Sequence, residues 1–266
     1  MNAEQAAAAS AGQAAASLWE TRRARRLVLP LPASIAPRDE QEGASVQLAL
    51  ARLAGAVPCA GFKIGATGAR MREYLGLTAP AAGFMHAANV FRGHGAVSFA
   101  DCIKPGVECE VAVRLARDLP PGFYTRETVA DAVGEFVAGI EIVEDRYADL
   151  KALGAPTLIA DQVYHVAAVL GEQGDVDWRA LDIGSLRGRI LIDGVERDAG
   201  VTSDLMGHPF TCLAFLASSP VAAAFGGLKT GQCVILGSVT PPVWLDGPCE
   251  VTVVFDGLPM VNARLM

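Results

Sequence analysis

One stretch decides the fold of this chain: Gly106-Val107-Glu108-Cys109-Glu110-Val111-Ala112-Val113-Arg114. Its side chains alternate in character, which predicts a β-strand with the valines and Cys109 on one face and with Glu108 and Glu110 on the other. Residues two apart on a strand are separated by roughly 6.5–7 Å along the backbone, so both carboxylates can converge on one cation. Hard divalent ions such as Mg²⁺ and Mn²⁺ prefer such oxygens and keep positions open for water or substrate.

The alternative for this strand is an ordinary half-buried one whose polar face meets solvent. A second run bears on the choice: Gly139-Ile140-Glu141-Ile142-Val143-Glu144-Asp145-Arg146. Glu141 lies inside an otherwise apolar sequence, where a carboxylate is costly unless it is paired or coordinates a metal. We therefore expect Glu141 to be functional, whereas Asp145 and Arg146 are consistent with a solvated strand end.

The composition favours a well-packed globular protein. Of the 266 residues, 52% are hydrophobic and 19% are charged, and the mean hydropathy is positive. The formal charge of −7 weighs against nucleic acid or another polyanion as a partner. An anionic substrate would then need a local counter-charge, from a metal or from a lysine or arginine.

The sequence lacks the patterns typical of secretion and of membrane spans. Its first basic cluster follows the alanine-rich segment, and no run approaches the roughly 18 apolar residues needed to cross a bilayer. The six cysteines show neither Cys-x-x-Cys spacing nor a dense secreted framework, so they are expected to be reduced. We predict a cytoplasmic protein that binds neither membrane nor nucleic acid.

The first sixty residues are predicted to form helices. Residues 3–27 are rich in helix formers and end in arginines, which favour a helix C-terminus. After Asp39, a suitable N-cap, residues 46–53 place apolar side chains at helical spacing. We expect residues 1–60 to be an N-terminal helical segment packed on the core and residues 61–266 to be the main domain, the two forming one compact unit.

Periodicity and turn residues place the remaining elements. A helix is expected from Arg126 to Val137, capped by Thr125, with a buried stripe of valines and Phe136. Hairpin turns are predicted at Asp193-Gly194 and Asp256-Gly257. Further helices are expected near 69–75 and 210–217, and strands near 83–85, 89–91, 96–99, 187–193, 232–237 and 249–255.

Three other segments carry side chains suited to binding or proton transfer. Lys63 lies in a predicted strand, residues 61–65, and points opposite to its apolar neighbours; an exposed strand lysine is the alternative. His165 lies in a second predicted apolar strand, residues 161–171, where a lone histidine is most often structural. Residues 237–240 offer backbone N–H groups and the hydroxyls of Ser238 and Thr240, which either hold a carboxylate or simply end a strand.

Five motifs together resemble a known family. They are Gly61-Phe62-Lys63-Ile64-Gly65, Pro105-Gly106-Val107-Glu108-Cys109-Glu110, Gly139-Ile140-Glu141-Ile142-Val143, Gly207-His208-Pro209 and Gly237-Ser238-Val239-Thr240. In order and spacing they resemble the 2-keto-4-pentenoate hydratase and 4-oxalocrotonate decarboxylase branch of the fumarylacetoacetate hydrolase superfamily. The resemblance extends from about residue 15 to the C-terminus. Each motif alone is weak, but the set is specific.

This resemblance implies a mixed α/β (α+β) fold with a rolled, mostly antiparallel β-sheet and peripheral helices, residues 61–266 being the catalytic domain. It also implies a Mg²⁺ or Mn²⁺ site with Glu108, Glu110 and Glu141 as ligands. Lys63 would then lie beside the substrate as a proton shuttle or carboxylate anchor. A homo-oligomer is expected, possible companions being a paralogous hydratase, decarboxylase or aldolase.

The implied activity is that of a metal-dependent lyase. As a hydratase it would add water to a 2-hydroxy-2,4-dienoate or 2-oxo-4-enoate such as 2-keto-4-pentenoate, in the degradation of aromatic compounds. A 2-oxo-3-enedioate decarboxylase of the 4-oxalocrotonate type is the alternative enzyme, with hydrolysis or tautomerisation of an acylpyruvate behind it. A non-catalytic homologue that binds a keto acid is the alternative outside enzymes.

The chain departs from the family pattern at two places. Pro80-Ala81-Ala82-Gly83 stands where the family usually has Pro-Asp-aromatic-Gly, so a carboxylate is missing. Val163-Tyr164-His165-Val166 stands where a small Ala-Ser-Ser-Gly segment is common. Two roles for His165 follow: it replaces a lost acid-base group, or it only reshapes the wall of the site.

Overall fold

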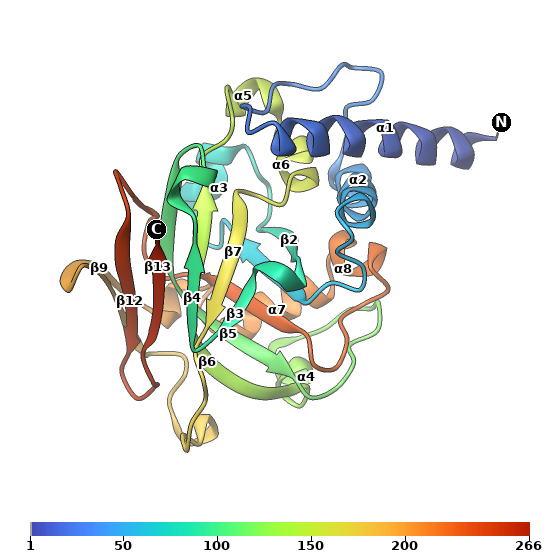
Figure 1. Ribbon diagram of the computed structural model, residues 1–266. Coiled ribbons are helices and arrows are strands. Elements are labelled where there is room, and N and C mark those ends of the chain that lie inside the picture. The colour runs from blue at the N-terminus through green and yellow to red at the C-terminus, as the bar shows by residue number, and fades with distance from the viewer. Residues whose placement is uncertain (1) are drawn as a thin grey trace.

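Two β-sheets organise the structure, which is a computed structural model that describes residues 2–266 (Figure 1). The larger sheet has eight strands in the order β2-β1-β10-β5-β6-β7-β3, with β11 paired to β5, and the smaller has five in the order β4-β13-β12-β8-β9. The strands are β1 (Gly61–Gly65), β2 (Ala81–Met85), β3 (Val90–Arg92), β4 (His94–Val97), β5 (Pro105–Leu115), β6 (Val133–Glu144), β7 (His165–Leu170), β8 (Arg187–Ile192), β9 (Val195–Val201), β10 (Cys233–Ser238), β11 (Val243–Trp244), β12 (Cys249–Phe255) and β13 (Val261–Leu265).

Most strand pairs in both sheets are antiparallel. The parallel pairs are β1 with β10, β3 with β7, and β4 with β13. The two predicted hairpin turns join β8 to β9 and β12 to β13, and both pairs are antiparallel. The prediction of a mixed α/β fold with mostly antiparallel sheet is therefore confirmed, although the chain forms two sheets and includes strands β9, β11 and β13, which lie outside the predicted strand ranges (Figure 1).

The centre of the larger sheet is the antiparallel pair of β5 and β6. The pair runs from Pro105 opposite Glu144 to Leu115 opposite Val133. Alternating valines and the isoleucines of β6 suit a sheet that is buried on both faces. Residues 106–114 thus belong to the middle strand of the larger sheet.

The predicted helix from Arg126 to Val137 is largely wrong. Thr125 does cap a helix, α4 (Arg126–Ala130), but β6 begins at Val133. The valines and Phe136 have spacings that suit either element, and β-branched residues gain more by pairing across β5, where Phe136 lies opposite Val113. Long-range pairing has overridden the local helical pattern.

The helices lie around the larger sheet (Figure 1). They are α1 (Ala3–Arg23), α2 (Glu40–Leu53), α3 (Ala69–Leu75), α4 (Arg126–Ala130), α5 (Leu150–Leu153), α6 (Ala155–Ala160), α7 (Pro209–Ala217) and α8 (Pro220–Ala224), with short 3-10 helices η1 (Ala87–Asn89), η2 (Phe99–Asp101), η3 (Trp178–Ala180) and η4 (Thr202–Asp204). The two predicted N-terminal helices are present, and Asp39 caps α2 by accepting a hydrogen bond from the Glu42 N–H. Helix α2 contacts α1, α6, α8 and β2. The N-terminal helices share one hydrophobic cluster with the larger sheet; a domain boundary at residue 60 stays a prediction.

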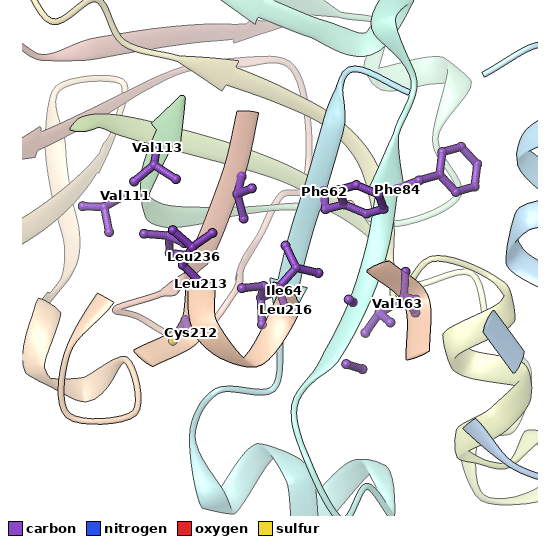
Figure 2. Packing of buried hydrophobic residues seen from close by; sticks show 14 of the residues in the cluster. Phe62, Ile64, Phe84, Val111, Val113, Val163, Cys212, Leu213, Leu216 and Leu236 are labelled. Carbon is purple, nitrogen blue, oxygen red and sulfur yellow. The ribbon is translucent and has the colours of Figure 1, made fainter. Parts of the chain in front are cut away.

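One face of the larger sheet is covered by α7. Figure 2 shows side chains from β1, β5 and β10 packed with those of this helix; the labelled ones include Phe62, Ile64, Val111, Val113, Leu236, Cys212, Leu213 and Leu216. Because side chains alternate along a strand, Lys63, Glu108 and Glu110 project from the opposite face. That second face carries the candidate site.

One segment, Thr202–Ala224, is long and apolar enough to cross a membrane by length and composition alone. It is broken into η4, α7 and α8, and most of its apolar window is buried inside the protein. We interpret it as a core segment, because core helices commonly pass the same test of length and composition.

Candidate metal centre and active site

The register of β5 and β6 brings three glutamates together. Glu108 lies directly opposite Glu141, and Glu110 lies opposite Gly139, so all three side chains leave the same face of the sheet. One carboxylate oxygen from each residue lies within 4.8 Å of those of the other two. In the structure the side chains of Glu108, Glu110 and Glu141 converge, as predicted.

These carboxylates lie where negative charge is poorly solvated. Glu110 and Glu141 are buried, and Glu108 is half-buried. Burial and the charge of Glu141 raise the pKa of Glu108 to about 8, and the same two causes raise the pKa of Glu110 well above its usual value. Burial also acts on Glu141, but Lys63 and His165 more than offset it and lower the pKa of that carboxyl. The cluster is therefore short of positive charge.

Lys63 is the cation that faces the three glutamates. It lies on β1, its side chain is almost fully buried, and its Nζ is 3.4 Å from Glu141 Oε1. The same Nζ donates a hydrogen bond to the carbonyl oxygen of Val163. Lys63 is thus not the exposed strand lysine of the alternative interpretation.

His165 also reaches this cluster, through a β-bulge. On β7, Ala167 pairs with Ile142 and His165 pairs with Val143, so Val166 is an extra residue between them. The bulge turns His165 toward the face that carries Glu141, and its Nδ1 lies 2.8 Å from Glu141 Oε1. Burial lowers the pKa of His165, and the contact with Glu141 opposes that effect.

The donor set fits a hard divalent cation. Three carboxylates face one lysine, and Glu141 Oε2 is buried with no hydrogen-bond partner within residues 2–266. An unpartnered buried carboxylate oxygen is costly unless a cation or another donor meets it. Oxygen donors in this number match the preference of Mg²⁺ and Mn²⁺.

The turn at residues 237–240 holds a carboxylate, but one of the protein's own. The Gly237 N–H donates a 2.7 Å hydrogen bond to Glu110 Oε2, while the Ser238 hydroxyl donates to the Thr240 carbonyl at 2.7 Å. The next two residues, Pro241 and Pro242, are among those that line a neighbouring cavity. Substrate contacts by Ser238 and Thr240 stay a prediction.

A cavity of about 830 Å³ opens over Lys63 and Glu108. Helix α3 contributes Met71, Tyr74 and Leu75, and the segment after β10 contributes Trp244. The charged residues of its outer part include Lys104, which pairs with Asp145 at 2.8 Å and lies over the ring of Trp244. The inner end of the cavity is therefore charged, and much of its outer wall is apolar and aromatic.

The turn before His165 has an unusual backbone. Gln162, Val163 and Tyr164 have φ angles of 62°, 50° and 68°, in the left-handed region. A β-branched residue such as Val163 is strained there, and strain of this kind concentrates at functional sites. The turn presents the Val163 carbonyl to Lys63 and places Tyr164 in the cavity wall. This turn replaces the first part of the strand predicted over 161–171, and Tyr164 was not among the predicted site residues.

The missing family carboxylate maps beside Lys63. Ala81 lies opposite Gly65 on β1, and Gly83 lies opposite Lys63, so Ala81 shares the sheet face of Lys63. A methyl group stands where the resemblance implies an acid. Among the described residues, Glu141 is the one carboxylate in an ion pair with Lys63.

Comparison with known proteins agrees with this fold. Residues 64–266 match the family model described as "Fumarylacetoacetate (FAA) hydrolase C-terminal". The chain is 29% identical over 246 residues to 2-hydroxyhexa-2,4-dienoate hydratase of Comamonas testosteroni, covering 91% of this chain and 92% of the relative. It is 28% identical over 257 residues to 2-keto-4-pentenoate hydratase of Burkholderia vietnamiensis, covering 94% and 95%.

Solved structures show the same architecture. The 4-oxalocrotonate decarboxylase from Pseudomonas putida G7, complexed with magnesium and adipate, superposes with a TM-score of 0.86 at 20% identity, covering 100% of this chain and 99% of that one. Fumarylpyruvate hydrolase from Pseudomonas aeruginosa, in complex with Mn²⁺ and pyruvate, gives 0.60 at 15% identity, covering 77% and 88%. The resemblance stated from the motifs is thereby confirmed: the chain belongs to the fumarylacetoacetate hydrolase family.

Proposed function

We propose that this protein is a metal-dependent hydratase that adds water to a 2-hydroxy-2,4-dienoate or 2-oxo-4-enoate, such as 2-keto-4-pentenoate, in the degradation of aromatic compounds. One observation carries the proposal: three converging carboxylates and one buried lysine form a cluster, and two of its members, Glu108 and Lys63, line a large cavity. The hydratase names of relatives that cover more than nine tenths of the chain support the same reaction class.

Glu108, Glu110 and Glu141 are the residues that would hold Mg²⁺ or Mn²⁺. Bound there, the ion would supply a Lewis acid for the carboxylate and C2 oxygen of the substrate, where negative charge develops in the enolate. The strand pair β5–β6 fixes two of the three residues opposite one another, and the Gly237 N–H fixes Glu110. The chain therefore presents the donors in a rigid sheet rather than on a loop.

Lys63 is the group that moves or holds a proton in this proposal. A lysine ammonium has three N–H donors. One donates to the Val163 carbonyl and one points at Glu141, which leaves one for the substrate. A lysine held this way can anchor the substrate carboxylate or exchange a proton with the carbon chain.

The outer wall of the cavity bears on whether the substrate is a monocarboxylate or a diacid. Met71, Leu75 and Trp244 offer apolar surface to the end of the substrate that is remote from the glutamates. Of the two other lysines that line the cavity, Lys104 is paired with Asp145, whereas Lys151 has no ion-pair partner among the described residues. The apolar surface supports hydration of a dienoate, while Lys151 is a cation that could meet the second carboxylate of an enedioate, the substrate of the alternative decarboxylase.

Assays with purified protein and Mg²⁺ test the proposal. Hydration of 2-hydroxypenta-2,4-dienoate, followed by loss of the dienol absorbance and by product mass, is the expected result, and Glu108→Gln should abolish it. Release of CO₂ from a 4-oxalocrotonate-type diacid without hydration of the dienoate would instead identify a decarboxylase. Binding of both acids without turnover would identify the non-catalytic homologue, which the methyl group of Ala81 keeps open.

Assembly and location remain part of the proposal. We expect a homo-oligomer in the cytoplasm, with a paralogous hydratase, decarboxylase or aldolase as the candidate companion. Light scattering of the purified chain, alone and with such a partner, measures the assembly. A monomer at every concentration would contradict the oligomer.

A further inference from the structure

His165 is a buried histidine on β7, and its ring contacts one of the three glutamates. We infer that His165 is a positioning residue: its Nδ1 holds Oε1 of Glu141, which leaves Oε2 free to bind the cation. This inference rests on the proposed metal centre. It replaces the prediction that His165 is itself an acid-base group.

The ring does not border the cavity that holds Lys63 and Glu108. His165 borders a separate cavity of about 360 Å³, which is lined by Arg22, Arg146 and Asn89 among others. The residue is 4% exposed. From this position the ring can influence the substrate only by way of Glu141. His165 therefore does not act directly on the reacting carbon atoms.

The two oxygens of Glu141 have different surroundings. Oε1 lies 2.8 Å from His165 Nδ1 and 3.4 Å from Lys63 Nζ, while Oε2 is buried without a partner in the part of the chain that the structure describes. Two donors on one oxygen prevent the carboxylate from rotating. Partners of this kind orient metal-binding carboxylates, and losing one typically weakens metal binding about 10–100-fold.

The chain bends its backbone to make this contact. Without the extra residue Val166 in β7, the alternation along the strand would turn His165 to the other face of the sheet, away from Glu141. The strained turn at residues 162–164 comes directly before it. The bulge and the strained turn together place the imidazole of His165 against Glu141. Because strained backbone is concentrated at functional sites, we interpret this contact as functional.

Titration of the folded protein with Mn²⁺ tests the inference. His165→Phe keeps an aromatic ring but removes the donor, and it should weaken Mn²⁺ binding about 10–100-fold. His165→Asn keeps an N–H near the position of Nδ1 and should restore affinity to within about threefold of the wild type. The matched control is His86→Phe, which borders the same smaller cavity and whose Nε2 faces the Ala54 carbonyl; it should bind Mn²⁺ like the wild type.

Kinetics give a second measurement. The Mg²⁺ concentration for half-maximal hydration should rise in His165→Phe by the same factor, while turnover at saturating Mg²⁺ stays within about threefold of the wild type. A purely structural role would not raise this concentration selectively. Should His165→Phe fail to fold, His165→Ala provides the variant without a donor.

Three results decide between the claims. Unchanged Mn²⁺ affinity in the donor-free variant, or equal weakening in His165→Asn and the donor-free variant, overturns the role of His165. Loss of turnover at saturating Mg²⁺ with unchanged Mn²⁺ affinity also overturns it, in favour of acid-base action. Failure of the wild type itself to bind Mn²⁺ overturns the metal centre of the proposed function instead.

Discussion

Two buried charge clusters lie in this protein, and they are built in opposite ways. In the first, Asp161 accepts hydrogen bonds from Arg22 at 2.7 Å, from Arg146 at 2.6 Å and from the Tyr147 hydroxyl at 2.9 Å. In the second, Glu108, Glu110 and Glu141 share Lys63 as their buried cation. Positive and negative charges balance around Asp161, because Glu144 also pairs with Arg146 at 3.6 Å, whereas negative charge exceeds positive charge around the three glutamates.

The pKa values follow this difference. Burial alone would raise the pKa of Asp161, but Arg146 and Arg22 outweigh it and lower that pKa. Burial and mutual repulsion raise the pKa of Glu108 to about 8. A cluster whose charges satisfy one another stabilises the fold, whereas a cluster left in deficit indicates a binding site for a missing cation. The segment from Asp161 to His165 joins the two, since it begins in the first cluster and ends on Glu141.

The largest expected effect is the loss of metal binding in Glu110→Gln. The variant removes one of three proposed ligands, so Mn²⁺ affinity measured by titration calorimetry should fall by more than about 100-fold, and hydration should fall with it. The metal-free variant should be at least as resistant to urea as the metal-free wild type, because it buries one charge fewer. Unchanged affinity would remove Glu110 from the ligand set.

Lys63→Met removes the cation that faces the three glutamates. Turnover should fall about 10²–10⁴-fold, because the proton-handling group is gone. Mn²⁺ binding should persist or tighten, since a competing cation has left the cluster. The matched control is Lys104→Met at the outer part of the same cavity, which should keep most of the activity. Normal turnover in Lys63→Met would reject a catalytic role for this lysine.

Asp161→Asn should act on stability rather than on the metal. It removes the carboxylate that the buried Arg146 and the half-buried Arg22 share, and breaking such a buried pair costs about 3–5 kcal/mol of unfolding free energy. Urea unfolding of wild type and variant, both without metal, measures the cost. The exposed Glu127→Gln provides a control that should unfold like the wild type. A loss as small as that of this control would show that Asp161 is not a structural centre.

The smallest expected effect is a pH dependence that belongs to Asp161. Its pKa is lower in the folded protein than the usual 3.8, so its stabilising contribution is complete above pH 3.8 and declines as the pH falls through the lower folded value. Between about pH 4 and pH 2 the wild type should therefore lose stability more steeply than Asp161→Asn. Urea midpoints at successive pH values measure this, and parallel curves would contradict it.

Local patterns in the sequence were enough to predict much of the candidate metal centre. Alternation put Glu108 and Glu110 on one face, and an isolated acid in an apolar run marked Glu141. These signals are carried by residues close in sequence. The family resemblance added the ligand roles and Lys63, and the structure brings all four side chains together.

What the sequence did not reveal depends on long-range contacts. Arg146 was expected at a solvated strand end, but it is buried because Asp161, fifteen residues away, reaches it. The position of His165 depends on a bulge that forms where β7 pairs with β6. The left-handed turn at 162–164 contains no glycine, so the sequence gives no signal for it. The helix predicted over 126–137 failed for the same reason, since pairing with β5 decided its second half.

The central claim is that the three glutamates bind one cation. Anomalous diffraction from crystals grown with Mn²⁺ tests it most directly, because the signal locates the metal without reference to activity. We expect one anomalous peak per chain, within a bonding distance of about 2.0–2.3 Å of carboxylate oxygens from Glu108, Glu110 and Glu141. A peak elsewhere, or the ammonium of Lys63 bridging all three carboxylates in the presence of Mn²⁺, would contradict it.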